Sequence, residues 1–208
     1  MRSKVPKGLR GVMSIKDNPR EMLSILFVLK VYGRLGRYTV SRLTGLSEGK
    51  VRRILKDLAG RGYVDVSKGG SKLTENGLSF YLNYLNNLGL KEICLIRVKD
   101  KVGVCVHLKP KNKKFGVLEL RDEVVRGGAE GALILEVEKG ELMLHPVGRM
   151  RDHLPEVASH LSKSLELRDG DLIIVGFGRE LKGALKGAIS TATKISNEST
   201  STLSYPHP

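Results

Sequence analysis

The sequence has 208 residues, of which 36 are Lys or Arg and 22 are Asp or Glu, so its formal net charge is +14. This length favours one or two domains and is sufficient for a substantial hydrophobic core. The longest apolar run falls short of the roughly 18–20 residues that cross a bilayer, and the basic start MRSKVPKGLRG lacks the apolar stretch of a secretory signal. We therefore expect a cytoplasmic protein with no membrane partner.

The positive charge is concentrated in the first part of the chain. Residues 1–90 contain 17 Lys and Arg against six Asp and Glu, a net charge of +11, whereas residues 91–208 carry only +3. A local positive field attracts polyanions such as nucleic acids. An anionic membrane would also satisfy the charge, but the sequence has no basic amphipathic helix with Trp or Phe on its apolar face.

A flexible basic arm, residues 1–16, is predicted to precede three helices. The first helix can be capped by Asp17 or Asn18 and ends at Gly33. The second covers about residues 39–44, and the turn 45–47 leads to a third helix that ends near residue 59. The apolar residues of the third helix recur at positions i, i+3, i+4 and i+7 and therefore share one face: Val51, Ile54, Leu55 and Leu58.

A short hairpin and a fourth helix are predicted next. Residues 63–66 and 72–74 read as two strands that are joined by the turn KGGS. Asn76-Gly77 is expected to break the chain before a helix over residues 78–88. The Leu and Tyr residues of this helix are expected to share one face, which would pack on its own domain or form a dimer seam: Leu78, Tyr81, Leu82, Leu85 and Leu88.

Residues 45–77, GLSEGKVRRILKDLAGRGYVDVSKGGSKLTENG, resemble the winged helix-turn-helix of prokaryotic transcription regulators. The resemblance rests on the GLS turn, the apolar spacing of the third helix, the L-x-x-x-G-Y-V exit from that helix and the K-L-T-x-x-G end of the hairpin. It implies that residues 17–90 form a winged-helix domain whose third helix enters the major groove of DNA.

The basic residues of this region are the predicted nucleic-acid contacts. Arg is suited to bidentate contacts with guanine and Lys to contacts with phosphate. The alternative interpretation is that these residues belong to an ordinary solvated helix face and hairpin turn. The basic arm and the basic loop KPKNKK (109–114) could likewise contact nucleic acid or be solvated surface, and a solvated surface is favoured for the loop. The predicted binding residues are Lys50, Arg52, Arg53 and Lys56 of the third helix, Lys68 and Lys72 of the hairpin, and Arg42 of the second helix.

The pattern of residues 91–195 predicts a domain of the α+β class, in which helices and a mostly antiparallel sheet form an α/β sandwich. Strands are expected at 93–98, 102–108, 132–137, 141–144 and 171–177, and helices at 115–126, 152–165 and 181–195. The strand 93–98 is apolar at nearly every position, which predicts burial on both faces. Residues 196–208 show no packing pattern and predict a disordered tail.

The whole chain resembles an uncharacterised archaeal family in which a winged helix precedes a small α/β domain. The second domain resembles the GAD domain, which is found as an insertion in some aspartyl-tRNA synthetases. This resemblance rests on RDEVVRGGAEGALIL (121–135), GDLIIVG (170–176) and KGALKGA (182–188). It implies no catalytic residues.

No motif predicts a catalytic centre, a cofactor or a metal site, and we expect a protein that is not an enzyme. VGFGRELKG (175–183) has Leu181 where a dinucleotide fingerprint requires glycine, so tight packing of a helix on a strand is the better interpretation. The five histidines form neither HxxxH nor HExxH. Cys94 and Cys105 read as small core residues, although pairing of their two strands would bring the sulfurs together.

These features predict a DNA-binding transcriptional regulator whose second domain mediates dimerisation or senses an effector. Two alternatives stay open. The protein could be an RNA- or ribosome-associated factor, because RNA presents the same phosphates and winged helices also bind structured RNA. It could also be a protein-interaction module that binds no nucleic acid. The expected partners are DNA rather than RNA, and a second copy of the chain.

Overall fold

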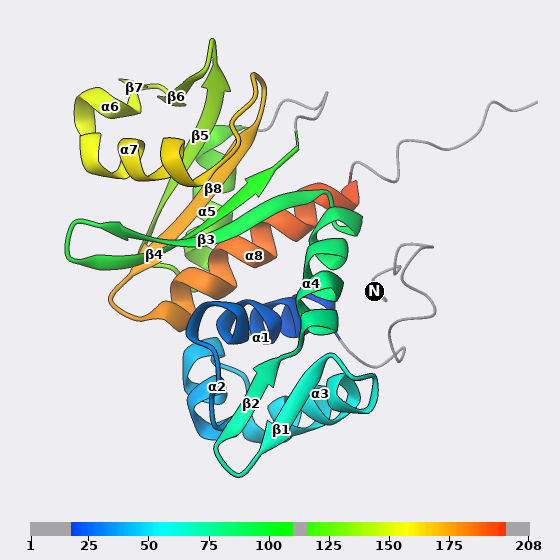
Figure 1. The fold of residues 1–208 in the computed structure, drawn as a ribbon. Helices are drawn as coiled ribbons and strands as arrows, with labels where there is room; N and C mark the ends of the chain where they lie inside the picture. The colour runs from blue at the N-terminus through cyan, green and yellow to red at the C-terminus, as the bar shows by residue number, and fades with distance from the viewer. Residues whose placement is uncertain (1–17, 110–115, 199–208) are drawn as a thin grey trace, which may run out of the picture. The chain divides into compact units, whose positions relative to one another are not determined.

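The computed structural model describes residues 18–109 and 116–198, and the chain divides into two compact units, Met1–Asn87 and Leu88–Pro208 (Figure 1). The predicted basic arm, most of the KPKNKK loop and residues 199–208 lie outside the described residues. No helix within the described ranges combines the length and the apolar character that crossing a bilayer requires.

The first unit has three helices, a hairpin and a fourth helix. The elements are α1 (Pro19–Tyr32), α2 (Arg37–Thr44), α3 (Glu48–Gly60), β1 (Val64–Ser67), β2 (Gly70–Leu73) and α4 (Glu75–Asn87). Asn18 caps α1 by accepting a hydrogen bond from the Arg20 amide at 3.1 Å, and Gly33 with φ +73° ends it. The β1–β2 hairpin is antiparallel.

The core of the first unit contains the apolar face of α3 and most of α1. Val51, Ile54, Leu55 and Leu58 are all buried, as the spacing predicts. In α1 the eight consecutive residues 22–29 are buried, because this helix is apolar around nearly its whole circumference. At the end of α3, the amide of Tyr63 donates to the Leu58 carbonyl at 2.9 Å. The intervening Gly62 has φ +75°, so the helix ends in a left-handed glycine turn.

The fourth helix begins earlier than predicted and includes Gly77. A Cβ at this position would lie 1.9 Å from the Tyr63 carbonyl oxygen, so glycine allows the first turn of α4 to pack directly on the backbone after α3. Thr74 caps the turn by accepting a hydrogen bond from the Gly77 amide at 2.9 Å. The expected chain break at Asn76-Gly77 was therefore wrong, because close packing and not a turn requires this glycine.

The expected apolar face of α4 divides into a buried and an exposed part. Tyr81 and Leu85 are buried, and so is Leu88, which follows the helix. Leu78 and Leu82 are 43% and 47% exposed. The buried face of α4 is centred on the side of the helix that carries Gly77, where the absence of a side chain allows close packing. Leu78 and Leu82 therefore lie at the edge of this buried face.

The second unit is built around a six-stranded antiparallel sheet with the strand order β3-β4-β8-β5-β6-β7. Helices α5 and α8 pack on one face, and α6 and α7 contribute to the hydrophobic core on the other (Figure 1). This architecture confirms the predicted α+β class. The elements are β3 (Leu90–Val98), β4 (Lys101–Leu108), α5 (Val117–Arg126), β5 (Gly131–Glu138), β6 (Glu141–Leu144), β7 (Gly148–Arg149), α6 (Met150–His153), α7 (Pro155–Ser164), β8 (Leu172–Gly178) and α8 (Leu181–Glu198).

Three details of the second unit differ from the prediction. Strand β3 lies at a sheet edge and is only partly buried, whereas the neighbouring β4 is buried over six consecutive residues. The predicted helix 152–165 is two helices that meet at Leu154, because the following Pro155 disfavours a helical backbone there. Helix α8 extends to Glu198, and the Ser196 hydroxyl donates to the Leu88 carbonyl, so the start of the predicted tail is helical.

The small residues of α8 allow close approach of backbone to backbone. A Cβ on Gly183 would lie 2.2 Å from the Gly128 carbonyl oxygen, and one on Gly187 would lie 2.4 Å from that of Val124. In β8, a Cβ on Gly176 would lie 2.7 Å from the Ala184 carbonyl oxygen. The structure thus confirms that VGFGRELKG and the following helix serve tight packing.

Candidate nucleic-acid interface

The β1–β2 hairpin of the first unit is held by Arg34, which lies between α1 and α2. Its guanidinium donates to the Ser67 hydroxyl at 2.6 Å and to the Gly70 carbonyl at 2.8 Å, and it pairs with Asp65 at 2.5 Å. The hydrogen bond from Arg34 lowers the pKa of the Asp65 carboxyl. One side chain therefore contacts both strands of the hairpin near its tip.

Backbone pairing adds a second attachment of the same hairpin. Leu35 and Ser71 exchange two backbone hydrogen bonds, at 2.9 and 2.8 Å. Gly70 has φ +114°, and a Cβ there would lie 2.4 Å from the Leu35 carbonyl oxygen. Only glycine fits this position without moving the hairpin away from the α1–α2 segment.

A basic groove of about 620 Å³ lies between α3, the start of α2 and the hairpin. Arg37, Arg52, Lys56 and Lys68 contribute to its lining, which includes no Asp or Glu. The full lining is Gly36, Arg37, Arg52, Leu55, Lys56, Ala59, Val66, Ser67, Lys68, Gly69, Gly70 and Ser71. The groove thus combines four cationic side chains with an apolar component from Leu55, Ala59 and Val66.

The structure brings three of the seven predicted binding residues together in this basic groove: Arg52, Lys56 and Lys68. Arg53 is exposed on α3 outside the groove lining. Lys50 is exposed as well, but it forms an ion pair with Glu21 of α1 at 2.6 Å, which compensates its charge. Arg42 of α2 is exposed and does not line the groove.

The remaining predicted residue, Lys72, lies on the hairpin opposite Asp65. It is exposed but does not line the groove. Sequence reasoning missed Arg37, because the second helix was expected to start two residues later, and it missed Arg34. Gly33 and Gly36 on either side of Arg34 indicate a turn, but no local pattern identifies the hairpin as the partner of this side chain.

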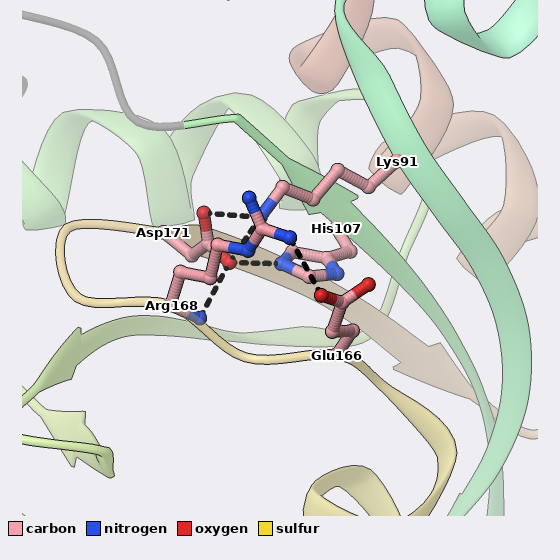
Figure 2. Close-up of polar contacts among 5 residues, drawn as sticks. All are labelled: Lys91, His107, Glu166, Arg168 and Asp171. Carbon is pink, nitrogen blue, oxygen red and sulfur yellow. Dashed lines mark hydrogen bonds and ion pairs between the residues drawn. The ribbon is translucent and has the colours of Figure 1, made fainter.

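The second unit contains a buried charged cluster around Asp171 (Figure 2). Lys91 donates to both carboxylate oxygens of Asp171, at 2.7 and 2.6 Å, and His107 Nε2 lies 2.7 Å from Oδ2. The backbone amide of Arg168 donates to the same oxygen at 2.9 Å. The Asp171 side chain has no exposed surface, and that of His107 is 1% exposed.

The pKa values of this cluster follow from burial and hydrogen bonding. Burial alone would raise the pKa of Asp171, but the hydrogen bonds from Lys91, His107 and the Arg168 amide outweigh it and hold the pKa below its usual value. Burial lowers the pKa of His107 more than Asp171 raises it. A neutral His107 therefore donates its Nε2 hydrogen to a charged Asp171.

This cluster links three neighbouring strands rather than forming an open site. Lys91 comes from β3, His107 from β4, and Asp171 directly precedes β8. Donors engage both carboxylate oxygens of Asp171, and the exposed Glu166–Arg168 ion pair, at 2.6 Å, lies beside the cluster. The sequence did not reveal it, because the partners lie 64 and 80 positions apart.

The two cysteines face each other across the β3–β4 ladder. Cys94 is paired directly with Cys105 in the strand register, and both are free thiols. The hydrogen bond with Cys94, together with burial, raises the pKa of the Cys105 thiol. Both side chains belong to the hydrophobic core, Cys94 at its margin, and the predicted approach of the sulfurs is confirmed.

By its fold, the protein belongs to the class in which a basic unit of helices and a hairpin precedes an α+β unit with an antiparallel sheet. Residues 98–195 match the family model described as a domain of unknown function, DUF4443. The hypothetical protein PH0730 from Pyrococcus horikoshii OT3 is 30% identical, and the match covers 88% of this chain and 95% of that one with a TM-score of 0.71. The chain therefore belongs to the same uncharacterised archaeal family as PH0730.

A partial similarity connects the chain to an enzyme. Over 115 residues it is 31% identical to the glyceraldehyde-3-phosphate dehydrogenase of Methanothermus fervidus. The match covers 54% of this chain but only 32% of the dehydrogenase, so the chain spans about a third of that relative's length.

Proposed function

We propose that residues 18–87 form a winged-helix domain that binds double-stranded DNA and that the protein is a DNA-binding transcriptional regulator. The order of the elements supports this proposal, because helices α1 to α3 are followed by the β1–β2 hairpin and α4. In such a domain α3 is the recognition helix and the hairpin is the wing. The second unit would then mediate dimerisation or sense an effector.

The observation that carries the proposal is the basic groove between α3 and the hairpin. Arg37, Arg52, Lys56 and Lys68 contribute four positive charges to a lining that has no carboxylate. Most hydrogen bonds between proteins and DNA go to phosphate and sugar, and Arg and Lys supply many of them. A surface that offers cationic donors with no internal acidic partner is suited to a polyanion.

The contrast between the two faces of α3 supports its role in the proposal. Its apolar residues are buried, so its basic residues must face the solvent, where Arg52 could reach phosphates and Arg53 base edges. Arg34 and the Leu35–Ser71 backbone pair fix the hairpin beside this helix. A preorganised groove needs less ordering of the chain when the ligand binds.

A homodimer is part of the same proposal. Leu78 and Leu82 lie one turn apart on α4 and are both about half exposed. Symmetric dimers of winged helices would read two half-sites of one operator. Analytical ultracentrifugation of the full chain should give a dimer, and Leu78→Ser with Leu82→Ser should shift it toward the monomer.

Fluorescence anisotropy with a labelled pool of random-sequence DNA duplexes tests the proposed function. Full-length protein should bind the duplex pool more tightly than a structured RNA of the same length and charge. Arg52→Ala with Lys56→Ala should weaken duplex binding at least about tenfold, because both residues line the groove. Tighter binding to the RNA would favour an RNA- or ribosome-associated factor instead.

A matched control removes the same charge elsewhere. Arg121 of α5 and Lys163 of α7 are exposed residues of the second unit. Arg121→Ala with Lys163→Ala should leave the dissociation constant for duplex DNA nearly unchanged. Absence of binding to either nucleic acid, or equal losses in both double variants, would contradict the proposal.

A further inference from the structure

The β5–β6 hairpin of the second unit brings together two carboxylates and a histidine. Glu136 and Glu138 are two residues apart on β5, so their side chains emerge on the same face of the sheet. His145 directly follows β6, which pairs with β5. Its Nε2 atom lies 3.1 Å from Glu138 Oε1 and 3.6 Å from Glu136 Oε2, and one ligand atom from each residue lies within 4.8 Å of the other two.

The charges of this cluster are not balanced. Among the described residues, no Lys or Arg forms an ion pair with Glu136 or Glu138, and the imidazole of His145 is their partner. The same hairpin shows the opposite imbalance at Glu141, which pairs with both Arg149 and Arg151. Two carboxylates thus share one imidazole, although two arginines meet a single carboxylate nearby.

We propose that Glu136, Glu138 and His145 bind a divalent transition-metal ion of the Zn²⁺ class. Nitrogen and oxygen ligands lie about 2.0–2.2 Å from Zn²⁺, which places adjacent ligand atoms roughly 3.0–3.5 Å apart in tetrahedral or octahedral geometry. The Nε2–Oε distances of 3.1 and 3.6 Å are close to this spacing. The positive charge of the ion would also compensate the two carboxylates.

The chemistry of the donors determines which ion fits. Imidazole together with carboxylate suits Zn²⁺, Co²⁺ or Ni²⁺, whereas Mg²⁺ and Ca²⁺ prefer a shell composed only of oxygen atoms. Three protein ligands on a partly exposed hairpin leave the remaining coordination positions to water. The spacing E-x-E-x₆-H does not match a metal-binding motif of a helix, so the three residues are recognised as neighbours only when β5 and β6 pair.

Isothermal titration of the tag-free full-length protein with ZnCl₂, and separately with MgCl₂, tests the proposal. Zn²⁺ should bind the parent protein saturably. In Glu138→Gln and in His145→Asn, either one binding site per chain should be lost or the affinity should fall at least about tenfold. Mg²⁺ should give no comparable heat. All three ligand side chains are partly exposed, so the variants are expected to keep the fold, which a thermal unfolding curve without metal checks.

The control is another exposed histidine. His160 of α7 lies outside this cluster, and His160→Asn should bind Zn²⁺ like the parent protein. Zn²⁺ should also raise the melting temperature of the parent and the control more than that of His145→Asn. If the parent does not bind Zn²⁺, or if both histidine variants bind it equally, the cluster is an ordinary surface ion pair. These outcomes do not depend on whether the first unit binds DNA.

Discussion

The two units of this protein place their ionisable side chains in opposite settings. In the first unit, Arg37, Arg52, Lys56 and Lys68 line an open groove that contains no carboxylate. In the second, Lys91 and His107 surround Asp171, and the three side chains satisfy one another in the interior. Charges that are compensated inside the fold are already satisfied, and removing one partner is costly, whereas charges left facing solvent together are available to a partner. The difference separates a structural cluster from a candidate interface.

Removal of Asp171 should have the largest effect on stability. Asp171→Ala leaves Lys91 and His107 without their buried partner, and breaking such a cluster costs about 3–5 kcal/mol of unfolding free energy. Urea denaturation of the full chain measures the loss. Glu166→Gln, which breaks the neighbouring exposed ion pair with Arg168, is the control and should leave the urea midpoint unchanged. Similar midpoints for both variants would contradict the structural role of Asp171.

Oxidation should join the two cysteines and stabilise the second unit. Treatment with diamide would convert the Cys94 and Cys105 thiols to one disulfide, while the reagent is reduced to its hydrazine and takes up the two protons and two electrons. Closing this short loop is expected to add about 2 kcal/mol to the unfolding free energy. Mass spectrometry detects the loss of two hydrogens, and Cys94→Ser should abolish both the mass change and the stabilisation. A cross-link between chains instead would argue against the paired register.

A change in the hairpin that alters no charge should weaken binding in the first unit. Gly70→Ala places a Cβ against the Leu35 carbonyl and must move the hairpin, so duplex binding should fall about tenfold although every basic side chain remains. Gly69→Ala is the matched control, because its Cβ would meet only ordinary contacts and its φ is not positive. Equal affinities for the two variants would show that the hairpin position does not matter.

The smallest expected effect is the dependence of stability on pH. The pKa of His107 is lowered in the folded protein by burial, so the unfolded chain binds protons more readily as the pH falls below about 6.5. Asp171, with its pKa lowered by its hydrogen bonds, loses its stabilising contribution at still lower pH. The melting temperature should therefore decrease from pH 7 to pH 5, and His107→Asn should reduce this dependence. A melting temperature that rises over this range would contradict the neutral state of His107.

The parts of the fold that could be predicted are those encoded by neighbouring residues. Apolar spacing identified the buried face of α3, and Asn18 and Gly33 marked the ends of α1. Gly77 was misread, because the contact that requires a glycine there is with the Tyr63 carbonyl and not with the local turn. The division of the helix 152–165 was also predictable in principle, because Pro155 restricts the backbone of the residue before it.

The candidate site was predictable to a similar extent. The outward direction of Arg52 and Lys56 follows from the helical period. The groove itself depends on Arg34 and Gly70, which join segments more than 30 positions apart. The Asp171 cluster depends on separations of 64 and 80 positions, and the Glu136–Glu138–His145 cluster depends on strand pairing. Such juxtapositions leave no periodic pattern in the sequence.

The salt dependence of duplex binding tests the central claim most directly. A protein that neutralises one phosphate fewer shows a slope of log K against log salt concentration that is smaller in magnitude by about 0.9 for duplex DNA. Arg52→Ala with Lys56→Ala should therefore reduce the magnitude of the slope by about 2, while Arg121→Ala with Lys163→Ala should leave it unchanged. Equal slopes for the groove variant and the parent protein would contradict the assignment of the basic groove as the nucleic-acid interface.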